Sequence, residues 1–153
     1  MTHHDIKHRL IRVLAIGLIV SMSSIVCAAG TAGEPPDQFA PAGLQKAEVE
    51  AFLARLRQAV SDPQVFADLV EYPMALRAAG RQVQVRNRAD LIARFETIVT
   101  PRLRATIKSQ RADDLIVRSE GIGLGDGDLW FSGICDDASC KAVRLRIISI
   151  QSQ

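Results

Sequence analysis

The chain has 153 residues, 48% of them hydrophobic and 24% charged, which suits one small domain with its own core. Its formal net charge is +2, and only 5% of its residues are aromatic. The basic residues are not interleaved with aromatic ones, which argues against nucleic-acid binding.

Residues 1–28 are predicted to be a secretory signal peptide. A basic lead with Lys7, Arg9 and Arg12 precedes an apolar run over residues 13–26, which is the order found in signal peptides. Small residues favour cleavage after Ala28 or Ala29. The run is short for a membrane span, which needs about 20 residues, so a retained anchor is the weaker alternative. We expect a periplasmic or secreted protein that meets the membrane only before cleavage.

Cleavage would remove all three histidines of the chain, His3, His4 and His8. It would also reduce the 19 basic and 17 acidic residues to 16 of each. A domain without imidazole excludes Ser-His-Asp catalysis, Cys-His catalysis and histidine-ligated metal sites. The aspartates at 126, 128, 136 and 137 lack the spacing of a calcium loop and suit ordinary turns. We therefore expect no metal and no other cofactor.

After the signal peptide, residues 29–43 are rich in proline and glycine and predict a flexible leader. The domain is assigned to residues 44–153. Apolar residues at helical spacing predict a helix over 44–60. Asp62, as an N-cap before Pro63, predicts a second short helix that runs to about Leu69 and is stopped by Tyr72-Pro73.

Two short strands follow, over residues 74–77 and 82–85, around a turn that contains Gly80. Asn87 has the position of a helix cap, and apolar residues at helical spacing follow it up to residue 99. Thr100 before Pro101 predicts the start of another helix. The middle of the chain is therefore predicted as a hairpin followed by two helices.

The last third predicts three strands, over residues 115–124, 128–135 and 142–150. Gly125-Asp126-Gly127 is typical of a hairpin turn. In the final strand, apolar residues at 143, 145 and 147 alternate with Arg144 and Arg146, which predicts one buried and one solvated face. An antiparallel meander covered by N-terminal helices is an α+β domain.

Cys135 and Cys140 are the only cysteines beyond the signal peptide. An even pair in an exported protein predicts a disulfide, here across a hairpin loop. A redox couple or half of a metal site are the alternatives, but redox motifs usually have the spacing C-x-x-C.

The order of these elements resembles the NTF2-like superfamily, which includes SnoaL and ketosteroid isomerase-like proteins. The resemblance also rests on Glu71-Tyr72-Pro73, on Asn-Arg-Ala-Asp-Leu at 87–91 and on Gly-Asp-Gly-Asp-Leu-Trp-Phe at 125–131. It is greatest to small exported bacterial members of unassigned function. It implies a cone in which a curved antiparallel sheet wraps around N-terminal helices, with a pocket at the open end. Enzymes of the superfamily use a pocket carboxylate as base, often with a Tyr or His that holds the developing oxyanion.

Asp68, Glu71 and Tyr72 are the first candidates for such chemistry, with Glu120 as a further carboxylate. A carboxylate and a phenol at one pocket mouth can perform acid-base catalysis when burial raises the pKa of the carboxylate. The alternative is that the carboxylates are solvated and that Tyr72 packs in the core with its hydroxyl bonded to the backbone.

A ligand pocket is predicted to be lined by Tyr72, Phe95, Trp130 and Phe131. Trp130 and Phe131 are neighbours on a strand, so their side chains point to opposite faces of the sheet. One of them is expected in the core and the other in a pocket or covering the sheet. The alternative is that both side chains pack in the core or cover the sheet without binding a ligand.

Charge is unevenly distributed along the chain. Nine basic residues lie among 72–111 against two acidic ones, and seven acidic residues lie among 112–140 against Arg118. A concentrated basic face could bind an anionic polymer or an acidic protein. The alternative is that the two blocks face each other or are solvated.

These features together predict an exported, non-catalytic binding domain for a small apolar ligand or an envelope protein. A pocket enzyme of the isomerase or dehydratase type is one alternative. An inhibitor or immunity protein against a cell-wall-directed enzyme is another. A homodimer is one option for its assembly.

Overall fold

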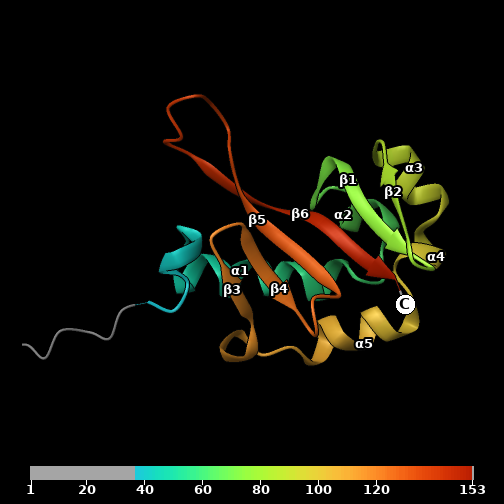
Figure 1. The fold of residues 1–153 in the computed structure, drawn as a ribbon, viewed down its shortest axis with the longest axis horizontal. Helices are drawn as coiled ribbons and strands as arrows, with labels where there is room; N and C mark the ends of the chain where they lie inside the picture. The colour runs from blue at the N-terminus through green and yellow to red at the C-terminus, as the bar shows by residue number, and fades with distance from the viewer. Residues whose placement is uncertain (1–36, 153) are drawn as a thin grey trace, which may run out of the picture. The chain divides into compact units, whose positions relative to one another are not determined.

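The computed structural model describes residues 37–152, which form an α+β domain (Figure 1). The predicted signal peptide and most of the predicted leader lie outside these residues. The elements in chain order are η1 (Ala40–Ala42), α1 (Lys46–Ala59), α2 (Pro63–Ala67), β1 (Val70–Ala78), β2 (Arg81–Val85), α3 (Arg88–Ala93), α4 (Phe95–Ile98), α5 (Pro101–Ser109), η2 (Ala112–Asp114), β3 (Ile116–Arg118), β4 (Gly121–Leu124), β5 (Leu129–Cys135) and β6 (Val143–Ser152).

The predicted helix starts are confirmed at three side-chain caps. The Asp62 carboxylate accepts hydrogen bonds from the amides of Gln64 and Val65 at the start of α2. Asn87 accepts from the amide of Asp90 at α3, and Thr100 accepts from the amide of Leu103 at α5. These side chains satisfy amide groups that a helix N-terminus leaves without a partner.

The strands form one six-stranded sheet in the order β2-β1-β6-β5-β4-β3. The predicted antiparallel sheet is wrong at one pair, because β1 and β6 run parallel while the other pairs are antiparallel. A parallel pair needs a long crossover, and here the crossover contains α3 to α5 and the whole β3–β5 meander. The sheet is therefore mixed.

Two predicted strands also differ from the structure. The stretch predicted as one strand over 115–124 is a hairpin of β3 and β4 with a turn at Ser119 and Glu120. β1 begins at Val70 and continues through the cis Tyr72–Pro73 bond, where its register against β6 shifts. Proline cannot donate a backbone hydrogen bond, so it interrupts the ladder without ending the strand.

β6 departs from the predicted alternation. Its register against β5 shifts between Ile147 and Ser149, and both Ile147 and Ile150 are buried. An extra residue in one strand is a β-bulge, which changes the face to which the following side chains point. Val143 is 39% exposed rather than buried, since it is the first residue of β6 and pairs with Cys135 at the loop end of the β5–β6 hairpin.

The core lies between the helices and one face of the sheet. Phe39 is fully buried in it, and the Asp37 carboxylate accepts hydrogen bonds from the amides of Phe39 and Lys46. Residues 37–43, predicted as part of a flexible leader, are therefore part of the domain. The buried aromatic ring explains the difference, because it anchors a stretch that its prolines and glycines predict to be loose.

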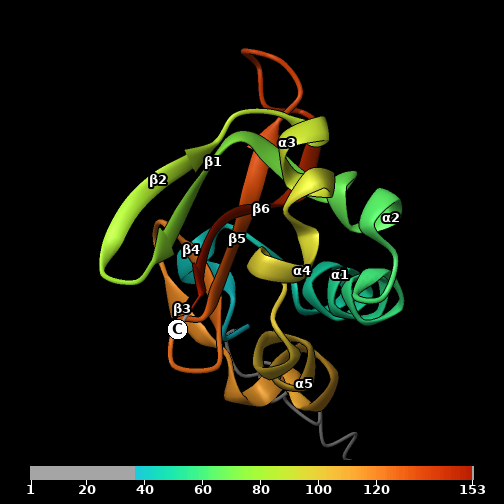
Figure 2. The same ribbon diagram turned by 90° about the vertical axis from the view of Figure 1, so that its right-hand side faces the viewer.

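The helices cover one face of the sheet and leave the other without a helix over it within residues 37–152 (Figures 1 and 2). The strand register shows which residues share this open face, because cross-strand partners point to the same side of a sheet. Ala75 is the partner of Ser149, Ser149 of Trp130, and Trp130 of Gly123. None of the described helices is both long and apolar enough to cross a membrane.

Candidate functional site

Tyr72 does not form an acid-base pair with a carboxylate. Its hydroxyl donates a hydrogen bond to the carbonyl oxygen of Ala67 at 3.0 Å, and its ring packs against the edge of the core. Burial raises the pKa of this phenol from 10.0 to about 12. The phenol therefore stays protonated near neutral pH and is bonded to the backbone, as the alternative interpretation expected.

None of the three carboxylates named with Tyr72 accepts the hydrogen bond of its hydroxyl, which goes to the carbonyl oxygen of Ala67. Asp68 is exposed and forms an ion pair with Arg88 at 2.7 Å between Oδ1 and Nε. Glu71 is half-buried, without a hydrogen bond or ion pair to another described residue. Glu120 lies in the β3–β4 turn, at the opposite end of the strand order from the β1–β2 hairpin. Glu120 is therefore remote from the other three candidates, and none of the three carboxylates shares a hydrogen bond with Tyr72.

The four predicted pocket residues do not line one cavity either. Phe131 is fully buried and contacts Phe52, with 4.7 Å between the ring centroids. Phe95 is also in the core, with its ring edge-on to Phe66 at 5.6 Å. Only Trp130 lines one of the described clefts. The expectation that Trp130 and Phe131 point to opposite faces is confirmed.

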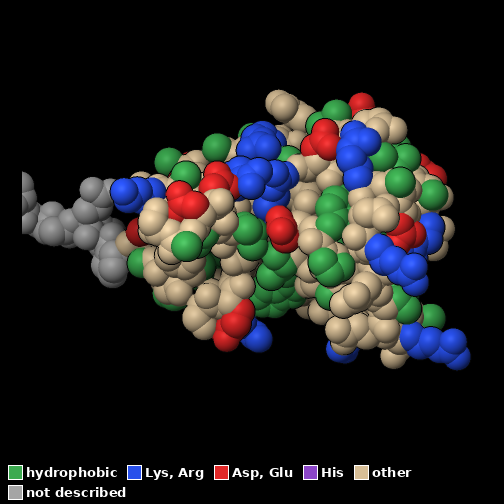
Figure 3. All heavy atoms as spheres, turned by 90° about the horizontal axis from the view of Figure 1, so that it is seen from above, with side chains coloured by type: hydrophobic (Ala, Val, Ile, Leu, Met, Phe, Trp, Pro, Cys, Tyr) green, Lys and Arg blue, Asp and Glu red, His purple; other side chains and the backbone are tan. Residues whose placement is uncertain are grey.

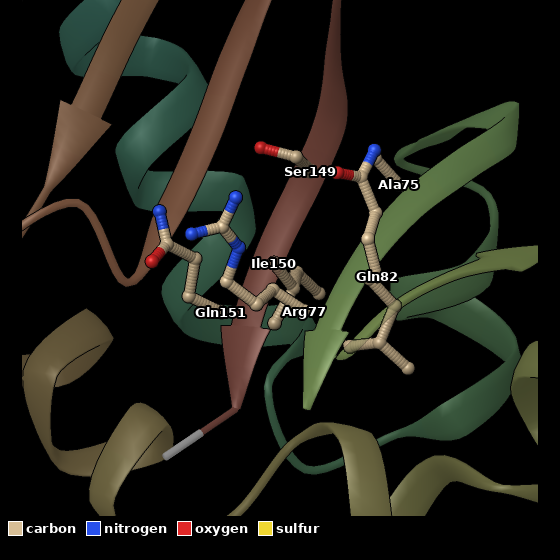
Figure 4. Close-up of a pocket in the computed structure, with 7 residues that line it drawn as sticks. Ala75, Arg77, Gln82, Ser149, Ile150 and Gln151 are labelled. Atoms are coloured by element: carbon tan, nitrogen blue, oxygen red, sulfur yellow. The ribbon is translucent and has the colours of Figure 1, made fainter. Parts of the chain in front are cut away.

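Two adjoining clefts on the open face of the sheet form the candidate site, which we call the sheet groove. The first, the Arg77 cleft, has a volume of about 160 Å³ and is lined by Ala75, Leu76, Arg77, Gln82, Ser149, Ile150 and Gln151 (Figure 4). The second, the Trp130 cleft, has a volume of about 300 Å³ and is lined by Arg118, Glu120, Trp130, Ile148, Ser149 and Gln151. Ser149 and Gln151 belong to both clefts, so the groove crosses the sheet.

Trp130 lies against the sheet because its cross-strand partner is Gly123. A Cβ atom built on Gly123 would be 3.1 Å from the indole ring, so the missing side chain makes room for the ring. The guanidinium carbon of Arg118 lies 5.4 Å from the centroid of the indole, which is within cation–π range. Trp130 itself is half-buried and contributes a large apolar surface to the groove.

The parallel β1–β6 pair brings the polar lining of the Arg77 cleft together. Arg77 is the register partner of Gln151 on β6 and of Gln82 on β2. Sequence reasoning missed these residues because it did not pair β1 with β6. The available signal was the polar Ser149 and Gln151, but the predicted alternation places them on the buried face because it does not include the bulge of β6.

A third described cleft lies between α1 and β6. It has a volume of about 230 Å³ and is lined by Glu48, Ala51, Phe52, Arg55, Val143, Arg144, Leu145 and Arg146. Arg144 pairs with Asp136, and Arg146 donates to the backbone oxygen of Asp68. These two cations therefore already have partners within the domain.

The predicted basic block does not form a single surface. Five of its nine cations make ion pairs with described residues, one of them between Arg102 and the buried Asp128 of the acidic block. Blue and red side chains are interspersed on the face seen in Figure 3. Arg77, Arg81, Arg86 and Lys108 have no ion pair with another described residue.

The sulfur atoms of Cys135 and Cys140 are within bonding distance at the end of the β5–β6 hairpin, with 4.8 Å between the Cα atoms. The predicted pairing is consistent with this geometry. In the described part of the chain, no three side chains of the metal-ligating types are grouped as a metal site.

Comparisons with protein-family models, curated proteins and solved structures found no match.

Proposed function

We propose that this protein is an exported, non-catalytic binding domain of the NTF2-like type, and that its ligand is a small molecule bound in the sheet groove. The observation that carries the proposal is the groove itself. It crosses a sheet face without a helix over it and combines the only tryptophan of the chain with polar side chains. Ligand sites typically combine an apolar surface with a few polar groups that fix orientation.

The arrangement of the elements supports the NTF2-like type. Two helices precede a β-hairpin, further helices follow it, and the last strands complete a sheet with its helices on one face. The sequence segments that resemble the NTF2-like superfamily lie in β1, at the Asn87 cap of α3 and across the β4–β5 turn.

The surroundings of Tyr72 support a non-catalytic role. A base needs to lie within hydrogen-bond reach of the proton that it removes, and it needs a partner that stabilises the developing charge. The hydroxyl of Tyr72 donates its hydrogen bond to the carbonyl oxygen of Ala67, and Asp68 forms an ion pair with Arg88. The apolar part of the groove is instead flanked by Glu120 and Arg118, two exposed groups of opposite charge.

The cysteine pair supports export. Disulfides persist in oxidising compartments such as the periplasm and the extracellular space. The sulfur atoms of Cys135 and Cys140 are within bonding distance, with 4.8 Å between the Cα atoms. We therefore propose a periplasmic or secreted location, in keeping with the predicted signal peptide.

The test uses the full chain, expressed with its own leader and purified after export. Trp130 is the only tryptophan, so intrinsic emission reports on the groove without labelling. Small molecules with an apolar part are expected to change this emission saturably. Ile148→Ala should weaken their binding roughly fivefold, because it removes about 1 kcal/mol of apolar contact.

Val65→Ala is the matched control, because Val65 is 48% exposed on α2 and lines none of the described clefts. It should leave binding unchanged. The proposal is wrong if no compound changes the emission of Trp130, or if both variants weaken binding equally. Saturation by a protein from the cell envelope, with no small ligand found, would favour the envelope partner instead.

A further inference from the structure

We propose that the ligand of the sheet groove is an amphipathic carboxylate, whose carboxylate binds at Arg77 and whose apolar body lies against Trp130. This inference rests on the proposed function of the groove. It adds a chemical class to the ligand and assigns a role to Arg77, which the sequence did not indicate.

The charge of the Arg77 cleft supports an anionic group. Its lining contains one cation, the two amides of Gln82 and Gln151, and the hydroxyl of Ser149, but no acidic side chain. Arg77 has no ion pair or hydrogen bond with another described residue, whereas Arg88 and Arg94 each pair with an aspartate at 2.7 Å. The cleft therefore offers donors and a positive charge that no acidic residue of its lining neutralises.

The geometry suits a carboxylate in particular. In Figure 4 the side chains of Arg77 and Gln151 lie side by side, and the Gln82 amide extends towards Ser149. A guanidinium presents its donors in a planar fork that matches the two oxygens of a carboxylate. The neighbouring amides can donate to the remaining lone pairs of the same group. A volume of about 160 Å³ is enough for such a head group.

The Trp130 cleft provides the apolar surface next to this site. It adjoins the Arg77 cleft at Ser149 and Gln151 and adds the side chains of Trp130 and Ile148. Arg118 and Glu120 both line this cleft, so its lining carries one charge of each sign. The uncompensated positive charge is confined to the Arg77 cleft, which favours a ligand with one anionic end and an apolar body.

The experiment compares 4-cyclohexylbutanoate with 4-cyclohexylbutanamide, two non-fluorescent probes of the same shape. Binding to the exported protein is measured by calorimetry and by Trp130 emission. The acid should bind on the order of tenfold more tightly, as expected for hydrogen bonds to a charged group. Added salt should weaken binding of the acid but not of the amide.

Arg77→Gln should remove the preference for the acid, because binding of the acid should weaken about tenfold more than binding of the amide. Arg81→Gln is the matched control, because Arg81 lies in the same hairpin, also lacks an ion pair and lines none of the described clefts. It should keep the preference. Arg77→Lys should restore part of it, and circular dichroism should give the same spectrum for all variants.

The inference is overturned if acid and amide bind equally, although the groove would then still bind small molecules. It is also overturned if Arg81→Gln reduces the preference as much as Arg77→Gln, since the effect would then come from overall charge. If neither probe binds, the proposal that the ligand is an amphipathic carboxylate is overturned. The wider search for ligands with Ile148→Ala and Val65→Ala then decides the proposed function separately.

Discussion

Tyr72 is the residue whose surroundings separate the binding interpretation from the catalytic one. Burial raises the pKa of its phenol from 10.0 to about 12 while the hydroxyl donates to Ala67. The pKa of Tyr72 is higher in the folded protein than in the unfolded chain. The free energy of unfolding that the protonated phenol contributes is therefore fully present below pH 10. It is lost as the pH rises from 10 to about 12.

Tyr72 is the only tyrosine of the chain, so absorbance at 295 nm reads its ionisation alone. The midpoint should lie near pH 12 in the folded protein and near pH 10 in urea, with circular dichroism reporting on the fold. A folded midpoint of 10 would contradict the burial of the phenol. Tyr72→Phe should lower the free energy of unfolding by about 1 kcal/mol and leave binding in the groove intact.

At the scale of single elements, β4 offers two glycines with different roles. Gly121 has φ +150°, and a Cβ atom there would lie 2.6 Å from the carbonyl oxygen of Phe131. Gly123 lacks a positive φ and faces the indole of Trp130 instead. The same substitution at the two positions therefore tests the backbone and the groove separately.

Gly121→Ala should lower the free energy of unfolding by about 1–3 kcal/mol, as measured by urea denaturation. Gly123→Ala should have a smaller effect on stability but shift the emission maximum of Trp130, because the indole must move away from the new methyl group. Equal losses of stability without a spectral shift at Gly123 would contradict the position of the indole over β4.

The β5–β6 hairpin carries the cysteine pair away from the groove. Replacing both Cys135 and Cys140 by serine should lower the free energy of unfolding by about 2 kcal/mol, the chain-entropy estimate for so short a loop. Thermal unfolding measures this loss, with the reduced wild-type protein as the control. Binding in the sheet groove should not change, and a loss of binding would mean that the loop contributes to the site.

Local signals in the sequence predicted the elements well. The caps at Asp62, Asn87 and Thr100 act through hydrogen bonds within a few residues, so their effect can be derived without knowing the fold. The division of 115–124 into β3 and β4 was missed because the turn at Ser119 and Glu120 lacks the usual Asn-Gly or Asp-Gly pattern. The bulge in β6 was missed because it depends on the partner strand.

The groove is a property of the whole molecule. Its lining comes from strands far apart in the sequence, such as β1 with Arg77 and β6 with Gln151. Their parallel pairing depends on tertiary packing rather than on any local pattern, so the sequence could supply Trp130 but not its neighbours. Phe39 is a similar case, because its burial depends on a core that forms elsewhere in the chain.

The indole N–H signal of Trp130 reports directly on whether the sheet groove binds a small molecule. This signal should be a single resolved peak in a ¹H–¹⁵N spectrum, since the chain has one tryptophan. Titration with 4-cyclohexylbutanoate should move it saturably, together with the backbone signals of Ala75, Ser149 and Gln151. Saturable shifts confined to the α1–β6 cleft, with the indole signal unmoved, would mean that the ligand does not bind in the sheet groove.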